Sequence, residues 1–273
     1  MIELLRQQIA DERDNLAKTN KLRETLQLLT LKFIQDKGYF NNLAFVGGTA
    51  LRFLYDMRRF SEDLDFSVFD AKGYDFTDIV RVLEREFDLN GLKIETKPAV
   101  KKTVRSSMLK FPGLLKSTGL SPLASQTLSI KIKADSNSPC GWHLEKTLVN
   151  KLYALNISHF DLASLYAAKL HACFFRKYVK GRDFYDLLWY LGKKVKPNYQ
   201  LLNNAITQTQ GRDYKIDENN IMDFLTERVE SVDFSAAKKD VERFLQDKSE
   251  LKLLEKPIIL KSIRDVFGNS LIK

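Results

Sequence analysis

The sequence has little of what marks thiol, zinc or membrane proteins. Its 273 residues include two cysteines, Cys140 and Cys173, and three histidines. Neither residue type falls into a metal-binding or redox spacing, so we expect no zinc site. No apolar run is long enough to cross a bilayer, and the charged N-terminus does not resemble a signal peptide. We therefore expect a soluble, cytoplasmic protein.

The composition is that of a folded, basic protein. Apolar residues make up 44% of the chain and aromatic residues 11%, which is enough for a substantial core. The formal net charge of +9 favours a polyanionic partner such as RNA, DNA or a nucleotide. Many basic proteins of this size bind no nucleic acid, so charge alone does not decide the matter.

The pattern of apolar residues divides the chain into three regions. Apolar positions at helical spacing predict one or two N-terminal helices that end near Gly38. Strand-like segments and turns alternate between Leu43 and Asp135, where FPGLLKSTGLSP reads as a loop. From Glu145 onward the pattern is helical. We expect an α+β protein with two domains, residues 1–140 and residues 141–273.

A glycine pair lies at a predicted junction between a strand and a helix. Leu43–Val46 reads as a short buried strand, Gly47-Gly48 as a tight turn and Thr49–Met57 as a helix. Glycines let the backbone approach a ligand closely, and the N–H groups at a helix N-terminus favour phosphate. Such a pair is, however, most often only a turn.

Two aspartates follow on a predicted strand. The segment DLDFSV alternates, so Leu64, Phe66 and Val68 should face the core while Asp63, Asp65 and Ser67 share the other face. Two carboxylates this close repel each other unless a cation neutralises them, and hard oxygen ligands suit Mg²⁺. Two-metal phosphoryl transfer uses such a pair. An isolated Asp-x-Asp is more often a solvated strand edge, but the two motifs together are far more specific.

These motifs resemble a known family. The stretch GGTALRFLYDMRRFSEDLDF is similar to the signature of the polymerase-β-type nucleotidyltransferase superfamily, and RFSEDLDF is similar to the AbiEii-type toxins of bacterial toxin–antitoxin systems. That branch also has a helical lysine followed by an arginine-aspartate pair, which AAKLHACFFRKYVKGRDFYDLLWYL resembles. The likeness spans roughly Leu43 to Leu191.

The resemblance implies a fold, an activity and a set of site residues. The fold would be a polymerase-β-like core with a small mixed sheet, N-terminal helices and a helical C-terminal domain. The activity would be Mg²⁺-dependent transfer of a nucleotide from an NTP to a hydroxyl acceptor such as a tRNA, by a toxin that a cognate antitoxin controls. The implied residues are Gly47, Gly48 and Thr49 at the nucleotide phosphates, Asp63 and Asp65 at the metal, Lys169 at the triphosphate, and Asp183 as the acid after the arginine.

The residues around Lys169 agree in part with this assignment. Lys169 lies on a helical stripe where an apolar residue is expected, so its ammonium should point into a cleft, unless it snorkels from the edge of the stripe. Asp183 and Asp186 share a helix face, so either could reach the site. Arg182 and Asp186 could equally brace the helical domain.

One strand departs from the superfamily pattern. Polymerase-β-type enzymes usually supply a third carboxylate from a neighbouring strand, and in TLSIKIKADSNSP that position falls on Lys133. Asp135, two residues later on the same face, would substitute as the third metal ligand, or the ligand set is reduced to Asp63 and Asp65. A lysine there could contact phosphate instead.

A run of basic residues bears on the acceptor, and two other functions remain as alternatives to nucleotide transfer. Between Lys93 and Lys116 seven basic residues are opposed only by Glu95, and this run is either a solvated face or a guide for a nucleic-acid backbone. The alternatives are a phosphotransferase of the same fold and a catalytically degenerate nucleotide-binding protein.

Overall fold

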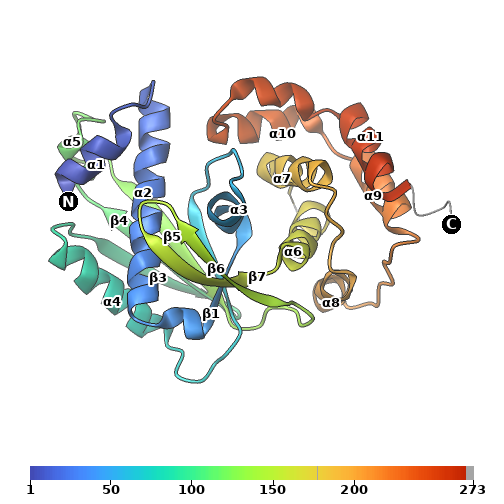
Figure 1. The fold of residues 1–273 in the computed structure, drawn as a ribbon, viewed down its shortest axis with the longest axis horizontal. Coiled ribbons are helices and arrows are strands. Elements are labelled where there is room, and N and C mark those ends of the chain that lie inside the picture. Colours follow the sequence, from blue (N-terminus) through green and yellow to red (C-terminus); the bar gives the residue numbers. More distant parts are fainter. Residues whose placement is uncertain (177, 269–273) are drawn as a thin grey trace. The chain divides into compact units, whose positions relative to one another are not determined.

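The chain divides into two units in the computed structural model, which describes residues 1–176 and 178–268. The first unit comprises Met1–Ser138 and Leu144–His159, and the second comprises Pro139–His143 and the chain from Phe160 onward. The expected α+β class is confirmed, because a mixed sheet and many helices are both present (Figure 1). The predicted boundary between residues 140 and 141 does not separate these units, because the strands of Leu144–His159 follow that boundary and belong to the first unit.

The first unit is built on a seven-stranded sheet in the order β3-β4-β5-β2-β1-β7-β6. Strands β1 and β2 are antiparallel, β2 and β5 are parallel, β1 and β7 are parallel, and β4 is antiparallel to both of its neighbours. The sheet is larger than the small one expected. Its strands are β1 (Leu43–Val46), β2 (Asp63–Val68), β3 (Glu95–Lys101), β4 (Val104–Phe111), β5 (Leu128–Asp135), β6 (Leu144–Asn150) and β7 (Ala154–Phe160).

The helices of this unit are α1 (Ile2–Ile9), α2 (Asn15–Asp36), α3 (Gly47–Tyr55), α4 (Phe76–Leu89) and the short α5 (Leu114–Ser117), with a 3₁₀ turn at Tyr39–Asn41. The two N-terminal helices were predicted, and they are followed by Gly38 in the left-handed conformation (φ 75°). Helix α5 lies in a segment predicted to be a loop throughout, and its single turn follows Gly113, which also has a positive φ of 68°.

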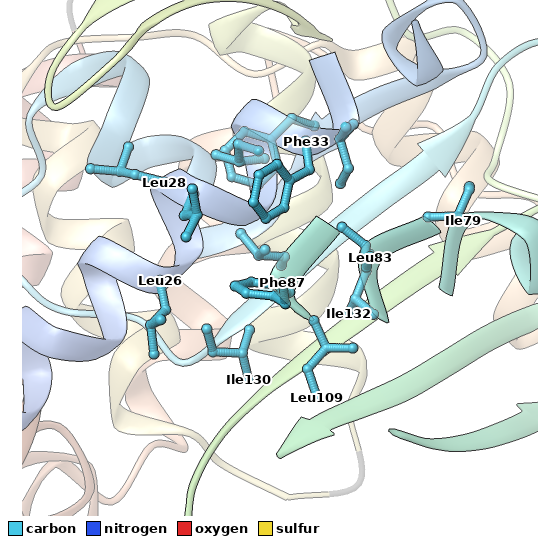
Figure 2. Close-up of a cluster of buried hydrophobic side chains, with 14 of the residues drawn as sticks. Leu26, Leu28, Phe33, Ile79, Leu83, Phe87, Leu109, Ile130 and Ile132 are labelled. Carbon is cyan, nitrogen blue, oxygen red and sulfur yellow. The ribbon is translucent and has the colours of Figure 1, made fainter. Parts of the chain in front are cut away.

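The core of the first unit lies between the sheet and the helices α2 and α4. Phe33 of α2 packs edge-on against Phe87 of α4, and Phe87 packs edge-on against Phe111 of β4, with ring centroids 5.2 and 5.1 Å apart. Figure 2 shows these helices placing side chains over Leu109, Ile130 and Ile132 of the sheet. Strand β5 alternates between buried and half-buried residues along its length. The polar positions of β5 therefore lie on the opposite face of the sheet.

Strands β6 and β7 are a correction to the helical pattern expected from Glu145. Strand β6 is an edge strand with most of its residues exposed, so it lacks the apolar alternation that identifies a half-buried strand. Strand β7 does alternate, with Leu155 and Ile157 fully buried. Its place in the sheet comes from parallel pairing of His159 with Phe45, a contact between residues far apart in the sequence.

The second unit is helical, as predicted. Its helices are α6 (Leu162–Phe175), α7 (Gly181–Gly192), α8 (Tyr199–Gln210), α9 (Ile221–Glu230), α10 (Phe234–Val241) and α11 (Lys256–Phe267), with 3₁₀ segments at Glu242–Phe244 and Lys248–Leu253. Phe184 of α7 packs edge-on against Phe174 of α6 and Phe234 of α10, with centroids 5.9 and 5.7 Å apart. Within the described part of the chain, no helix combines the length and the apolar character needed to span a membrane.

Candidate active site

The glycine pair forms the first two residues of helix α3, directly after β1. Gly47 has a positive φ of 81°, and a Cβ atom there would lie 2.8 Å from the Asp65 carboxylate oxygen Oδ2. A Cβ on Gly48 would collide with the guanidinium of Arg59. Gly47 is therefore favoured by its left-handed backbone and by the nearby Asp65 carboxylate. Gly48 is favoured because the buried Arg59 leaves no room for a side chain.

The hydroxyl of Thr49 links helix α3 to strand β2. Thr49 is 1% exposed, and its hydroxyl donates a hydrogen bond to the main-chain carbonyl of Asp63. This bond fixes the start of β2 against the N-terminus of α3, where main-chain N–H groups carry the positive end of the helix dipole. Contact of Gly47, Gly48 and Thr49 with phosphate stays a prediction. Because the Thr49 hydroxyl is already engaged, such a contact would come from the main chain.

Asp63 and Asp65 share one face of β2, as predicted, and Lys133 of β5 joins them. In the parallel β2–β5 pair, Asp65 lies opposite Lys133, and Asp63 lies opposite Lys131. The Lys133 ammonium donates to Asp63 Oδ2 and lies 3.1 Å from Asp65 Oδ1. The carboxylate pair is thus bridged by a cation from the chain itself.

The three charged groups are half-buried, which strengthens their interaction. Burial alone lowers the pKa of Lys133, but the carboxylates of Asp65 and Asp63 outweigh burial and raise that pKa above its usual value. Lys133 is therefore a fixed positive charge throughout the physiological pH range.

The donor set suits one Mg²⁺ ion that arrives with other ligands. Among the described residues no group of three or more His, Cys, Asp or Glu side chains could hold a metal. Mg²⁺ commonly binds through one or two carboxylates and completes its shell with water and substrate phosphates. Asp63 and Asp65 fit that pattern, although the Lys133 ammonium lies between them.

Asp135 lies at the end of β5, opposite Ser67 and two positions beyond Lys133. Its Oδ1 accepts hydrogen bonds from the Thr103 hydroxyl at 2.9 Å and from the Asn137 main-chain N–H at 3.0 Å. These bonds give Asp135 a role in holding the turn that follows β5. Its role as a third metal ligand stays a prediction.

The sheet face that carries the aspartates also carries a row of lysines, which we call the basic strip. Residues directly opposite each other on neighbouring strands share a face, and residues two apart on one strand do so as well. Lys97 of β3 lies opposite Met108 of β4, which lies opposite Lys131 of β5. Lys101 of β3 lies opposite Val104 of β4, which lies opposite Asp135 of β5. Lys110 of β4 lies opposite Ser129 of β5. The basic strip therefore consists of Lys97, Lys101, Lys110 and Lys131.

Lys169 belongs to a buried ionic cluster inside the helical unit. Its side chain is 10% exposed, and its ammonium lies 2.8 Å from a carboxylate oxygen of both Asp183 and Asp186. Arg176 pairs with the other oxygen of Asp183 at 2.7 Å. The alternative of a lysine that snorkels to open solvent is wrong, and the predicted shared face of the two aspartates is confirmed. Proximity of Lys169 to Asp63 and Asp65 stays a prediction.

Sequence reasoning missed Arg59 and the bridging role of Lys133. Arg59 is 2% exposed, and its guanidinium donates to the Phe60 carbonyl at 3.0 Å. The neighbouring Met57 and Phe60 are also buried and are the only local hint that this arginine points inward. The bridge from Lys133 depends on the β2–β5 register, which no local pattern specifies.

The structure thus has a carboxylate pair on a mixed sheet, beside a glycine pair at a helix N-terminus. The family model described as "Nucleotidyl transferase AbiEii toxin, Type IV TA system" matches residues 30–267, so the chain belongs to the AbiEii family.

Two solved structures from Helicobacter pylori share the fold. JHP933 is 17% identical with a TM-score of 0.55, and the match covers 91% of this chain and 94% of that one. A protein described as a candidate nucleotidyltransferase is also 17% identical with a TM-score of 0.51, and the match covers 92% and 96%. No curated protein matches the chain.

Proposed function

We propose that this protein transfers a nucleotide from an NTP, with Mg²⁺, to a hydroxyl group of an RNA acceptor such as a tRNA, and that a cognate antitoxin restrains it. The observation that carries the proposal is the Asp63–Asp65 pair on β2, held by the Thr49 hydrogen bond beside the N-terminus of α3. A metal-binding pair next to an anion-binding helix end suits a metal–triphosphate complex.

The proposal gives the aspartates and the glycine pair of the sheet unit separate roles. Asp63 and Asp65 would hold Mg²⁺, which when bound offsets the charge of the triphosphate and activates the attacking hydroxyl. The main-chain N–H groups at the start of α3 would bind phosphate oxygens. Gly47 and Gly48 allow this end of the helix to lie against Asp65 and Arg59.

The basic strip supports RNA as the acceptor. Its four lysines share a sheet face with Asp63 and Asp65, and neighbouring strands lie about 4.8 Å apart, so β3 is about 14 Å from β2. A nucleic-acid strand crossing β5, β4 and β3 would keep its phosphates near these lysines while its terminal hydroxyl lies at the carboxylate pair. This binding would be non-specific in sequence and steeply dependent on salt.

We propose that Lys169 binds the triphosphate and that Asp183 positions Lys169 or the acceptor. The support is the buried pairing of the Lys169 ammonium with Asp183, which holds the lysine in one conformation. A preorganised cation of this kind stabilises charge that develops on the leaving group. The antitoxin follows from the family, which is described as belonging to type IV toxin–antitoxin systems.

Labelled nucleotides test the reaction class. The purified protein is incubated with Mg²⁺, total cellular RNA and each NTP labelled at the α- or the γ-phosphate. We expect α-label in RNA, and none with Asp63→Asn. Transfer of γ-label would show a phosphotransferase, whereas Mg²⁺-dependent NTP binding without transfer to any RNA would show a degenerate binding protein.

Charge removal on the basic strip tests the acceptor. We expect Lys97→Gln combined with Lys110→Gln to weaken RNA binding at all sequences and to reduce the salt slope by about one for each lysine that no longer neutralises a phosphate. NTP binding should not change. Lys252→Gln combined with Lys261→Gln, at exposed positions of the helical unit, is the control with the same change in net charge. An unchanged salt slope in the double variant would exclude this face as the RNA site.

A further inference from the structure

The Lys133 ammonium lies where a cation shared by Asp63 and Asp65 would bind. It contacts Asp63 Oδ2 and lies 3.1 Å from Asp65 Oδ1, so one charged group bridges both carboxylates. The three side chains are 28%, 37% and 33% exposed, so they are neither free in solvent nor sealed in the core. An incoming ligand can therefore reach this group of charges from solvent.

The neighbouring Lys131 shows that this bridge is specific to one lysine. Lys131 shares the strand and the sheet face of Lys133 and lies opposite Asp63 in the register. In the described part of the chain, however, the ion pairs to Asp63 and Asp65 come from Lys133. Lys131 is thus a control lysine on the same strand and sheet face that does not bridge the carboxylates.

A metal ion and the Lys133 ammonium compete for the same place. Mg²⁺ bound by both carboxylates would lie about 2.0–2.1 Å from their oxygens. The ammonium already fills the space between those oxygens, and two cations a few ångströms apart repel each other. One of them must leave before the other can bind.

We propose that Lys133 is an internal counter-ion of the Asp63–Asp65 pair, which keeps the free metal out and withdraws when a metal-bound nucleotide arrives. The triphosphate would give the displaced ammonium new anionic partners on the same side of the sheet. This inference rests on the proposed function for the identity of the incoming ligand. It predicts that metal and nucleotide bind together, whereas free divalent cations bind weakly.

Metal binding without nucleotide tests the inference directly. Mn²⁺ is titrated into the full-length protein, with free Mn²⁺ measured by electron paramagnetic resonance, for the wild type, Lys133→Met and Lys131→Met. Even when water screens the charges, a unit charge beside a divalent ion weakens its binding measurably. We expect Lys133→Met to bind Mn²⁺ at least about tenfold more tightly than the wild type, and Lys131→Met to bind within about threefold.

A second neutral variant shows whether the effect of Lys133→Met comes from misfolding, and a second titration adds the nucleotide. Lys133→Gln removes the charge but keeps a hydrogen-bond donor, so it should give the same direction of change. With a non-hydrolysable NTP analogue present, the advantage of the neutral variants should shrink or reverse because the wild-type lysine then binds the phosphates. Equal or weaker Mn²⁺ affinity in both neutral variants, or no Mn²⁺ binding in any protein, would overturn the inference.

The titration separates this inference from the reaction class. It contains no acceptor and measures no transfer, so a failure to move α-label into RNA would refute the proposed function and leave the metal result unchanged. Conversely, wild-type affinities in the Lys133 variants would refute the counter-ion role while transfer activity remained intact.

Discussion

Substitution of Gly48 by alanine tests whether this glycine serves the fold as well as a ligand. Its φ is not positive, so an alanine there carries no backbone strain, and the whole cost is steric. The added Cβ would run into the guanidinium of Arg59, which is 2% exposed and cannot swing into solvent. Overpacking of a buried site typically costs about 1–3 kcal/mol.

The expected net destabilisation is about 1–2 kcal/mol, because alanine is favoured over glycine in helices by up to about 1 kcal/mol. For a unit of about 150 residues this corresponds to a loss of about 2–8 °C in Tm. Differential scanning calorimetry measures the change. Gly192→Ala is the control, since a Cβ there meets no atom within 4 Å.

A double-mutant cycle identifies the cause. If Arg59 is the obstacle, Gly48→Ala should be neutral or up to about 1 kcal/mol stabilising in an Arg59→Ala background, giving a coupling of about 1–3 kcal/mol. A wild-type Tm for Gly48→Ala, or additive losses in the double variant, would refute the steric argument. The glycine would then be explained by ligand approach alone.

Four further substitutions test other parts of the structure. Asp65→Asn should abolish transfer and leave Tm almost unchanged, because Lys133 retains Asp63; full activity would contradict the assigned site. Lys169→Met should cost about 3–5 kcal/mol in urea unfolding, because it strips buried carboxylates of a cation, and a wild-type midpoint would refute that cluster. Burial raises the pKa of Glu24 but Arg52 outweighs it, so the folded pKa lies below 4.5. Ionised Glu24 therefore stabilises the fold above about pH 4.5, and the stability deficit of Glu24→Gln should vanish as the pH falls through that lower pKa; a pH-independent deficit would exclude the ion pair. Asp135→Asn should slow transfer about 10²-fold if Asp135 binds metal, whereas an unchanged rate would leave two aspartates.

Local patterns predicted those elements whose burial is one-sided. Alternation in DLDFSV correctly placed Leu64 in the core and Asp63 on the other face. The stripe of α6 correctly indicated that Lys169 does not face open solvent. In each case apolar residues recur at the period of the strand or helix, so the sequence indicates which side of the element faces the core.

Features that depend on pairing between distant segments could not be predicted. Strand β6 is mostly exposed and has no apolar period, and the place of β7 in the sheet comes from parallel pairing with β1. The burial of Arg59 follows from its position over Gly48, and the Lys133 bridge follows from the β2–β5 register. A side chain's contacts across a sheet are fixed by tertiary structure, which the local sequence does not encode.

The bridge between Lys133 and Asp65 also bears on how the protein folds. These residues are 68 positions apart, and parallel pairing of β2 with β5 must wait until the intervening β3–β4 segment has been synthesised. Until then the nascent chain carries two neighbouring carboxylates with no partner from β5, and non-local pairing of this kind is slow. The charge balance of the site is thus completed only after β5 has been synthesised, and a ribosome-bound fragment that ends before β5 cannot contain the completed site.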